Sequence, residues 1–364
     1  MKKLLALLLA LVMVFSLAAC AEKAPVEEEA PVEEAPVEEA PVEEAPVEEA
    51  PAELTFAIVP KSAGNPYNER EASGFEEACA ALGVKSIVQY PEDTSAEAQI
   101  NVINNLIAQG VNGIAVAAND AEALESTLND AKAAGITVVS LDSDTKGSQL
   151  FINQAGVKEV AQVLVDSVYD MAGGAGEFAV LSASSTATNQ NSWIAAMEQI
   201  IAADEKYADL VWVETVYGDD ESQKSVDMTE SLMTNYPDLK VICCPTTVGV
   251  LACAQTVQNA GSAIKVAGLG LPSEMNGYVG EELPCPYMYL WNPIDVGATA
   301  AYAMQCIIDG ATTGTVGENF TAANGNAYDV IESDESVGVY STQIIVGPPY
   351  EFTADNIAEW AQVY

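Results

Sequence analysis

The chain of 364 residues contains no histidine. Ser-His-Asp and Cys-His catalysis are therefore excluded, together with every metal site that uses imidazole. The chain is also poor in positive charge, with 13 Lys and Arg against 54 Asp and Glu and a net charge of -41. So acidic a surface repels phosphate backbones and anionic lipid headgroups. We expect no nucleic-acid partner.

Motifs for cofactors and disulfide scaffolds are equally scarce. No P-loop occurs, and Gly268-Leu269-Gly270 is only a fragment of a dinucleotide fingerprint. The seven Cys lack dense spacing, and Cys243 and Cys244 are adjacent in an apolar run, so we expect those after Cys20 to be mostly buried small hydrophobes. Pairs of Asp and Glu are so common that their spacing neither favours nor excludes the two catalytic carboxylates of a glycosidase. We expect no cofactor, metal or catalytic residue.

The N-terminus has the pattern of a secretory signal peptide over residues 1–20. Lys2-Lys3 precedes an apolar run over residues 4–17, and Leu17-Ala18-Ala19-Cys20 follows. The run is too short to span a bilayer. Cys20 after Leu-Ala-Ala resembles a bacterial lipobox, which implies lipidation of Cys20 and attachment to the cell membrane through that lipid. An ordinary signal peptide with a chance Cys is the alternative.

Within residues 21–53, Ala-Pro-Val-Glu-Glu recurs with almost no variation from Ala24 to Glu49. Proline at every fifth position blocks a continuous helix, and neighbouring glutamates repel each other. We therefore expect a disordered, extended linker between the signal peptide and a globular part that begins at residue 54.

From residue 54 short apolar runs alternate with amphipathic stretches, in two series. Apolar runs without polar alternation indicate strands buried on both faces, and alternation with helices favours a parallel sheet. The fold class is therefore α/β, with two similar doubly wound lobes, while no element is predicted over residues 311–340. Strands are expected at 54–59, 84–90, 113–118, 136–141, 177–181, 210–217, 240–244, 264–269 and 287–291, and helices of the second series near 157–171, 190–203, 220–235, 248–260 and from 293 to about 310.

Polar side chains follow several of these strands. In open α/β sheets ligands bind beyond the carboxyl ends of the strands. If the two lobes face each other, such loops line a cleft suited to a small polyhydroxy ligand, because they offer both donors and acceptors. Asp142 and Asn189 could instead be local caps, and Tyr67 could be core packing. The candidate ligand-binding residues from these loops are Lys61, Asn65, Tyr67, Asp142, Asn189, Gln190, Pro245 and Thr247.

Seven segments together resemble the type I periplasmic binding proteins, the solute receptors of ABC importers, and within them the rhamnose and autoinducer-2 receptor branch. The resemblance covers residues 54 to about 310 and implies two lobes joined by a multi-strand hinge. The segments are VPKSAGNPY, INNLIAQGVNGIAV, SLDSDTKGSQLFINQA, SSTATNQNSW, VYGDDESQKSV, GLGLPSEMNGYV and LWNPIDVG.

The resemblance also implies particular pocket residues. Autoinducer-2 receptors use a Lys, an Asp, an Asp-Gln pair, a Pro and an Ala. Asn189 replaces the Asp of the pair and Thr247 replaces the Ala. Both departures are compatible with a hydroxyl-rich ligand and weaken the match to autoinducer-2 itself. The matching positions are Lys61, Asp142, Gln190 and Pro245.

The function implied is an extracytoplasmic lipoprotein that binds a small sugar or sugar-like furanosyl signal and presents it to an ABC permease with its ATPase. We expect the cleft to close by hinge bending, with a third crossing near residues 337–344. The lobes are expected to comprise residues 54–153 with 293–336 and residues 154–292 with 337–364. A sensor for a membrane signalling partner and, further off, a carbohydrate-active enzyme are the alternatives. Residues expected at the hinge, or in contact with ligand, are Asn153, Gln154, Trp291, Asn292 and Asp295.

Overall fold

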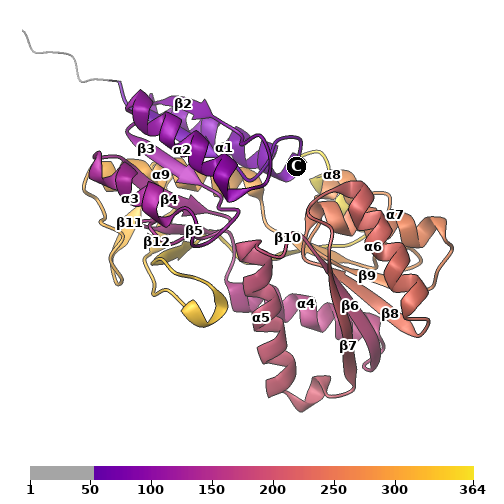
Figure 1. Cartoon of the computed structure of the whole chain (residues 1–364). Helices are drawn as coiled ribbons and strands as arrows, with labels where there is room; N and C mark the ends of the chain where they lie inside the picture. The colour runs from indigo at the N-terminus through magenta and orange to yellow at the C-terminus, as the bar shows by residue number, and fades with distance from the viewer. Residues whose placement is uncertain (1–52) are drawn as a thin grey trace, which may run out of the picture. The chain divides into compact units, whose positions relative to one another are not determined.

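The computed structural model describes residues 53–364 (Figure 1). The expected signal peptide, Cys20 and the linker up to residue 52 lie outside the described residues. Within residues 53–364, none of the helices combines the length and the apolar character that crossing a membrane requires.

The first lobe is built on a sheet of six parallel strands in the order β13-β5-β4-β3-β1-β2. Successive side chains of a strand point to opposite faces. Phe56 and Ile58 accordingly pack in one core, and Ala57 and Val59 in another. Apolar residues on both faces explain why these strands read as continuous apolar runs. The strands are β1 (Thr55–Val59), β2 (Lys85–Val88), β3 (Gly113–Val116), β4 (Thr137–Leu141), β5 (Phe151–Asn153) and β13 (Gln343–Ile345).

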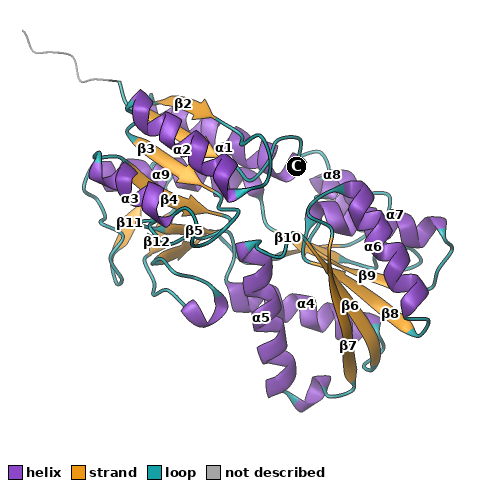
Figure 2. Ribbon diagram, viewed as in Figure 1, coloured by secondary structure: helices purple, strands orange, loops and turns teal. Residues whose placement is uncertain are grey.

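Helices cover both faces of this sheet (Figure 2). One face carries α1 (Pro66–Leu82) and α9 (Pro293–Ile308), and the other carries α2 (Ala96–Gln109) and α3 (Glu125–Ala133). Helices α1 and α9 approach so closely that a Cβ on Gly74 would lie 1.9 Å from the carbonyl oxygen of Ile294. Glycine is required there, because any side chain would collide with the neighbouring backbone.

The second lobe repeats this plan with four parallel strands in the order β7-β6-β8-β9. Helices α4 and α5 pack on one face and α6 and α7 on the other (Figure 2). The α/β class with two parallel sheets is thus confirmed. The elements are α4 (Val157–Met171), β6 (Gly176–Ser182), α5 (Thr188–Ala203), β7 (Leu210–Tyr217), α6 (Ser222–Asn235), β8 (Leu239–Cys244), α7 (Thr247–Asn259) and β9 (Lys265–Gly268).

Smaller elements complete both lobes. Strand β10 (Met288–Leu290) pairs antiparallel with β14 (Tyr350–Phe352) beside the second sheet. The region without a predicted element contains the hairpin of β11 (Asn319–Thr321) and β12 (Ala327–Asp329). The remaining helical turns are η1 (Glu205–Tyr207), α8 (Pro272–Met275), η2 (Glu335–Val337) and α10 (Ile357–Trp360).

The chain passes three times between the two lobes. It leaves β5 for α4 at residues 154–156, returns from β10 to α9 at residues 291–292, and leaves β13 for β14 at residues 346–349. The sequence predicts crossings near residues 153–154, 291–292 and 337–344, and the last connection between the sheets lies later than the third of these. Residues 343–345 belong to the first sheet because β13 pairs in parallel with β5. The expected inclusion of residues 343–345 in the second lobe therefore disagrees with the strand pairing.

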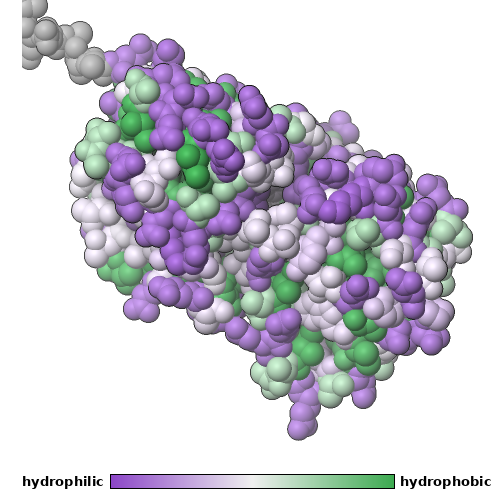
Figure 3. Space-filling model, viewed as in Figure 1, coloured by the Kyte–Doolittle hydropathy of each residue, from purple (hydrophilic) through white to green (hydrophobic). Residues whose placement is uncertain are grey.

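The six Cys among the described residues are all buried and free. Cys243 and Cys244 lie on β8 within the core, with no exposed surface. Burial raises the pKa of the Cys243 thiol to about 12, so it stays protonated and unreactive. This agrees with the interpretation of these residues as small hydrophobes. Hydrophilic residues instead cover much of the visible face (Figure 3).

Candidate functional site

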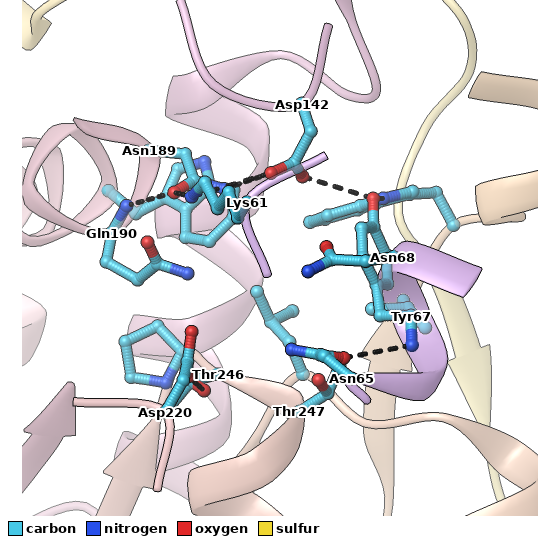
Figure 4. A pocket seen from close by; sticks show the side chains of 15 residues that line it. Lys61, Asn65, Tyr67, Asn68, Asp142, Asn189, Gln190, Asp220, Thr246 and Thr247 are labelled. Carbon is cyan, nitrogen blue, oxygen red and sulfur yellow. Dashed lines mark hydrogen bonds and ion pairs between the residues drawn. The ribbon is translucent and has the colours of Figure 1, made fainter. Parts of the chain in front are cut away.

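One pocket receives side chains from both lobes, at the carboxyl ends of their strands (Figure 4). The arrangement is the one that the strand-end loops predict, because parallel strands deliver their following loops to one edge of each sheet. The pocket is lined by Lys61, Asn65, Tyr67, Asn68, Asp142, Asn189, Gln190, Trp193, Asp220, Pro245, Thr246, Thr247, Leu269, Leu290 and Trp291.

Lys61, Asp142 and Asn189 form a polar triangle across the pocket. Lys61 Nζ donates to Asn189 Oδ1 at 2.7 Å and lies 3.6 Å from Asp142 Oδ2. Asn189 Nδ2 donates to Asp142 Oδ2 at 3.1 Å. Lys61 and Asp142 follow β1 and β4 of the first lobe, whereas Asn189 lies in the first turn of α5 in the second. The triangle therefore joins the two lobes.

Asp142 is held in an unusual backbone conformation, with φ of 57°. Its side chain is almost fully buried and accepts a further hydrogen bond from the Tyr67 hydroxyl at 3.1 Å. Burial raises the pKa of Asp142, and the charge of Lys61 opposes that rise. Asp142 is thus a strong acceptor that a ligand hydroxyl reaches only inside the pocket.

Tyr67, which donates to Asp142, belongs to a cluster of three aromatic side chains. Tyr67 accepts a hydrogen bond from Trp291 Nε1 at 2.6 Å, and the two rings lie edge to face with centroids 6.5 Å apart. The Trp193 and Trp291 rings lie 5.5 Å apart. Tyr67 is on the first lobe and Trp193 on the second, while Trp291 lies where the chain crosses between them. Tyr67 and Trp291 therefore line the pocket and also pack against each other.

The loop after β1 and the first turn of α1 each contribute an amide. Asn65 caps α1, because its Oδ1 accepts a hydrogen bond from the Tyr67 backbone at 3.0 Å. Asn68 donates to the Ser62 carbonyl at 3.1 Å. Both side chains also line the pocket. Asn65 thus combines the expected position with a local structural role.

The second lobe offers acceptors near Pro245 and Thr247. Gln190 is buried, and its Oε1 has no hydrogen-bond partner among the described residues. Thr246, between the two predicted positions, caps α7 and donates to the carboxylate of Asp220. This side of the pocket has unused capacity for hydroxyl donors.

The remaining hinge residues lie outside this pocket. Asn153 donates to Gln343 Oε1 at 2.8 Å, which ties β5 to β13. Asn292 caps α9 through the Ile294 backbone and also donates to Asp295 Oδ2 at 2.9 Å. Gln154 is buried beside Asn153. Of the five residues considered for the hinge or for ligand contact, Trp291 lines the pocket.

Sequence reasoning missed Asp220 and Glu71. Asp220 was interpreted as a helix start, although it follows β7 and the rule applied to other strands would have found it. Glu71 lies on α1, one turn beyond Tyr67, fully buried and with neither carboxylate oxygen hydrogen-bonded within residues 53–364. Burial, and then the charge of Asp142, raises its pKa. No local pattern distinguishes it from an exposed helical glutamate.

The polar side chains of this pocket are suited to holding a ligand through hydrogen bonds. Across residues 53–364, His, Cys, Asp and Glu form no group that could hold a metal ion. The polar groups are donors and acceptors in a buried setting where each hydrogen bond discriminates strongly.

Comparison with known proteins agrees with the fold. Residues 56–312 match the family described as the periplasmic binding protein domain. The chain belongs to this family. Its members are solute-binding proteins rather than enzymes, and the type I architecture of two parallel-sheet lobes is shared by its structural neighbours.

Three relatives illustrate the likeness. An ABC transporter solute-binding protein from Clostridium phytofermentas, solved with bound L-rhamnose, is 47% identical, with a TM-score of 0.82 over 86% of this chain and 99% of that one. LsrB from Clostridium saccharobutylicum in complex with AI-2 is 24% identical, with a TM-score of 0.76 over 84% and 99%, which shows the fold alone. The D-allose-binding periplasmic protein of Escherichia coli K12 is 25% identical over 276 residues, 72% of this chain and 86% of the relative.

Proposed function

We propose that this protein is the extracytoplasmic receptor of an ABC importer and binds a neutral monosaccharide, in the first place L-rhamnose. The observation that carries the proposal is a pocket in which hydrogen-bonding groups of both lobes meet and bond to each other. The rhamnose-bound neighbour at 47% identity supports this choice of ligand. Autoinducer-2 has weaker support, since its neighbour at 24% identity extends the argument no further than the fold.

The two sides of the pocket suit a deoxysugar. Lys61, Asp142 and Gln190 supply donors and acceptors for hydroxyls, as sugars require. Leu269, Leu290 and Trp291 add apolar surface. A 6-deoxysugar carries a methyl group where other hexoses carry a hydroxymethyl group, so apolar side chains favour it. Burying one such group contributes about 0.8 kcal/mol.

We expect binding to close the pocket by bending at the three crossings. A ligand that touches both lobes binds the closed arrangement more tightly, and that difference in affinity moves the equilibrium toward it. The crossings at residues 154–156, 291–292 and 346–349 are short segments, which favour bending over sliding. The closed form would then be the one that docks on the permease.

The proposal includes attachment to the membrane through Cys20, with the Ala-Pro-Val-Glu-Glu repeat as a spacer. Cells that express the full chain should incorporate labelled palmitate into it, and Cys20→Ala should abolish the labelling and release the protein from the membrane fraction. Equal labelling of both proteins would refute lipidation at Cys20.

A thermal-shift screen of the full-length chain tests the ligand class. It would compare L-rhamnose, L-fucose, D-ribose, D-allose and autoinducer-2. A ligand at about 100 times its Kd adds about 2.7 kcal/mol to stability, which a melting curve resolves. We expect the largest shift from L-rhamnose. Shifts from none of the sugars would overturn the proposal, and turnover of the bound sugar would favour an enzyme.

A further inference from the structure

Backbone conformation singles out a second acid of the pocket. Among residues 53–364, the non-glycine residues with positive φ are Asp142 at 57°, Asp219 at 54° and Asp220 at 53°. L-residues adopt this region rarely, and such strain gathers at functional sites. Asp142 and Asp220 both line the pocket, one from each lobe.

The Asp220 carboxylate is directed into the pocket by its neighbours. Thr246 donates its hydroxyl to Asp220 Oδ1. Oδ2 accepts no hydrogen bond from the described residues, and Figure 4 shows the carboxylate beside Thr246, on the side of the pocket where Gln190 lies. Gln190 Oε1 is the other acceptor there without a partner in the described part of the chain.

We infer that Asp220 is a specificity-determining ligand contact, and that it and Gln190 together accept hydrogen bonds from adjacent hydroxyls on the face of the sugar turned to the second lobe. The inference rests on the proposed function. Each lobe then supplies one acidic acceptor, Asp142 or Asp220, and Lys61 is the one cation that lines the pocket between them. Two carboxylates against one ammonium also disfavour acidic sugars, so the ligand class is a neutral sugar with adjacent hydroxyls.

The neighbouring Asp219 provides a matched control. Its φ nearly equals that of Asp220, but its side chain is 39% exposed and forms an ion pair with Lys224. It does not line the pocket. Asn tolerates positive φ as well as Asp does, so Asp219→Asn and Asp220→Asn change the same charge at nearly the same φ.

The experiment measures L-rhamnose affinity of the full-length chain by calorimetry. Asp220→Asn should weaken binding at least tenfold, since hydrogen bonds to a charged acceptor are the strong ones, while Asp219→Asn should stay within twofold of the wild type. Equal affinities of the two variants would overturn the inference. Melting temperatures report folding, and if Asp220→Asn does not fold, Asp220→Gly, which suits positive φ and also removes the carboxylate, carries the same expectation.

Monodeoxy analogues of L-rhamnose identify the hydroxyl involved. For the wild type, one analogue should have an affinity at least tenfold lower than that of L-rhamnose. For Asp220→Asn, the same analogue and L-rhamnose should have nearly equal affinities. An equal penalty in both proteins for every analogue would contradict a direct contact. If the wild type binds no sugar at all, the proposed function fails; if it binds and both variants bind alike, only the role of Asp220 fails.

Discussion

Asn189 Oδ1 lies 2.7 Å from Lys61 Nζ, so a hydrogen bond joins the two lobes across the pocket. The same amide donates to Asp142 Oδ2 at 3.1 Å. Asn suits this place because its oxygen meets the ammonium and its nitrogen meets the carboxylate. An Asp at position 189 would lack the donor and would repel Asp142.

Removal of this amide should weaken sugar binding. Asn189→Ala deletes one charge-assisted hydrogen bond to Lys61 and one to Asp142, each worth about 1.5 to 3 kcal/mol. We expect at least a tenfold increase in Kd by calorimetry. Asn191→Ala is the control, because Asn191 lies on the same helix and donates to the Ser185 carbonyl instead. Equal effects of the two variants would refute the role of Asn189.

Substitution of Asp142 should lower sugar affinity, whereas substitution of Asp144 should lower the stability of the fold. Asp142→Asn keeps the tolerated backbone conformation and loses the charge, so affinity should fall about 10- to 150-fold. Asp144 is equally buried but accepts hydrogen bonds from the backbones of Tyr340 and Ser341, at 2.7 and 2.8 Å. Asp144→Asn should therefore cost about 1 to 3 kcal/mol of stability and leave affinity within twofold. Unchanged affinity in Asp142→Asn, together with a loss of affinity in Asp144→Asn, would contradict the assignment of Asp142 to the binding site.

Glu71 should make stability depend on pH. Its pKa is raised by burial and by Asp142, with Lys61 in opposition, so the native state holds this proton more tightly than the unfolded chain does. Its contribution to stability is therefore full below the unfolded pKa of about 4.3 and is lost as pH rises through the folded value. Glu71→Gln should be more stable than the wild type at pH 7, by about 1 to 3 kcal/mol.

The difference should shrink as pH falls toward 4, where the wild-type carboxyl is protonated in both states. Urea unfolding at several pH values measures it. Glu77→Gln is the control, since Glu77 is exposed on the same helix and should give a pH-independent difference near zero. A stability difference for Glu71→Gln that does not vary with pH would show that the native fold does not raise the pKa of Glu71.

Gly297 should tolerate no side chain. Its Cβ would lie 1.8 Å from the Glu71 carbonyl oxygen, so Gly297→Ala forces α9 away from α1. Overpacking of this kind costs about 1 to 3 kcal/mol, measured by denaturant unfolding. Gly277 has no atom within 4 Å of its Cβ position, and Gly277→Ala should be nearly neutral. Equal stability of the two variants would rule out the close helix contact.

The longer elements could be predicted because their signal is local. Strand β7 and helix α4 have the bounds that the apolar pattern indicates, residues 210–217 and 157–171. Strands β5 and β13 have three residues each, too few for a pattern, and pair with each other from distant parts of the chain. Only the assembled sheet shows that residues 343–345 belong to the first lobe.

Capping signals were less reliable than periodicity. Asn119 and Glu122 have the spacing of a capping box, which predicts a helix start at Asn119. The prediction is wrong, because α3 begins at Glu125 and the side chain of Asp120 accepts from the intervening turn. Thr94 and Glu97 have the same spacing, but Ser95 caps α2. Several polar residues before one helix compete for the cap, and the backbone geometry decides among them.

The site was predictable where a residue directly follows a strand. Lys61 and Asp142 follow β1 and β4 and lie in the pocket as expected, although their contact with a ligand stays a prediction. Asp220 was missed because tandem acids before an amphipathic helix also suit a helix start. Glu71 could not be found, since its burial depends on the close contact between α1 and α9, which sequence patterns do not report.

Calorimetric titration of the full-length chain with L-rhamnose tests the central claim most directly. The two-lobed pocket predicts saturable binding with one sugar per chain, weakened at least tenfold in Asp142→Asn. A titration without binding of L-rhamnose or any other neutral monosaccharide would contradict the account, as would binding that Asp142→Asn leaves unchanged.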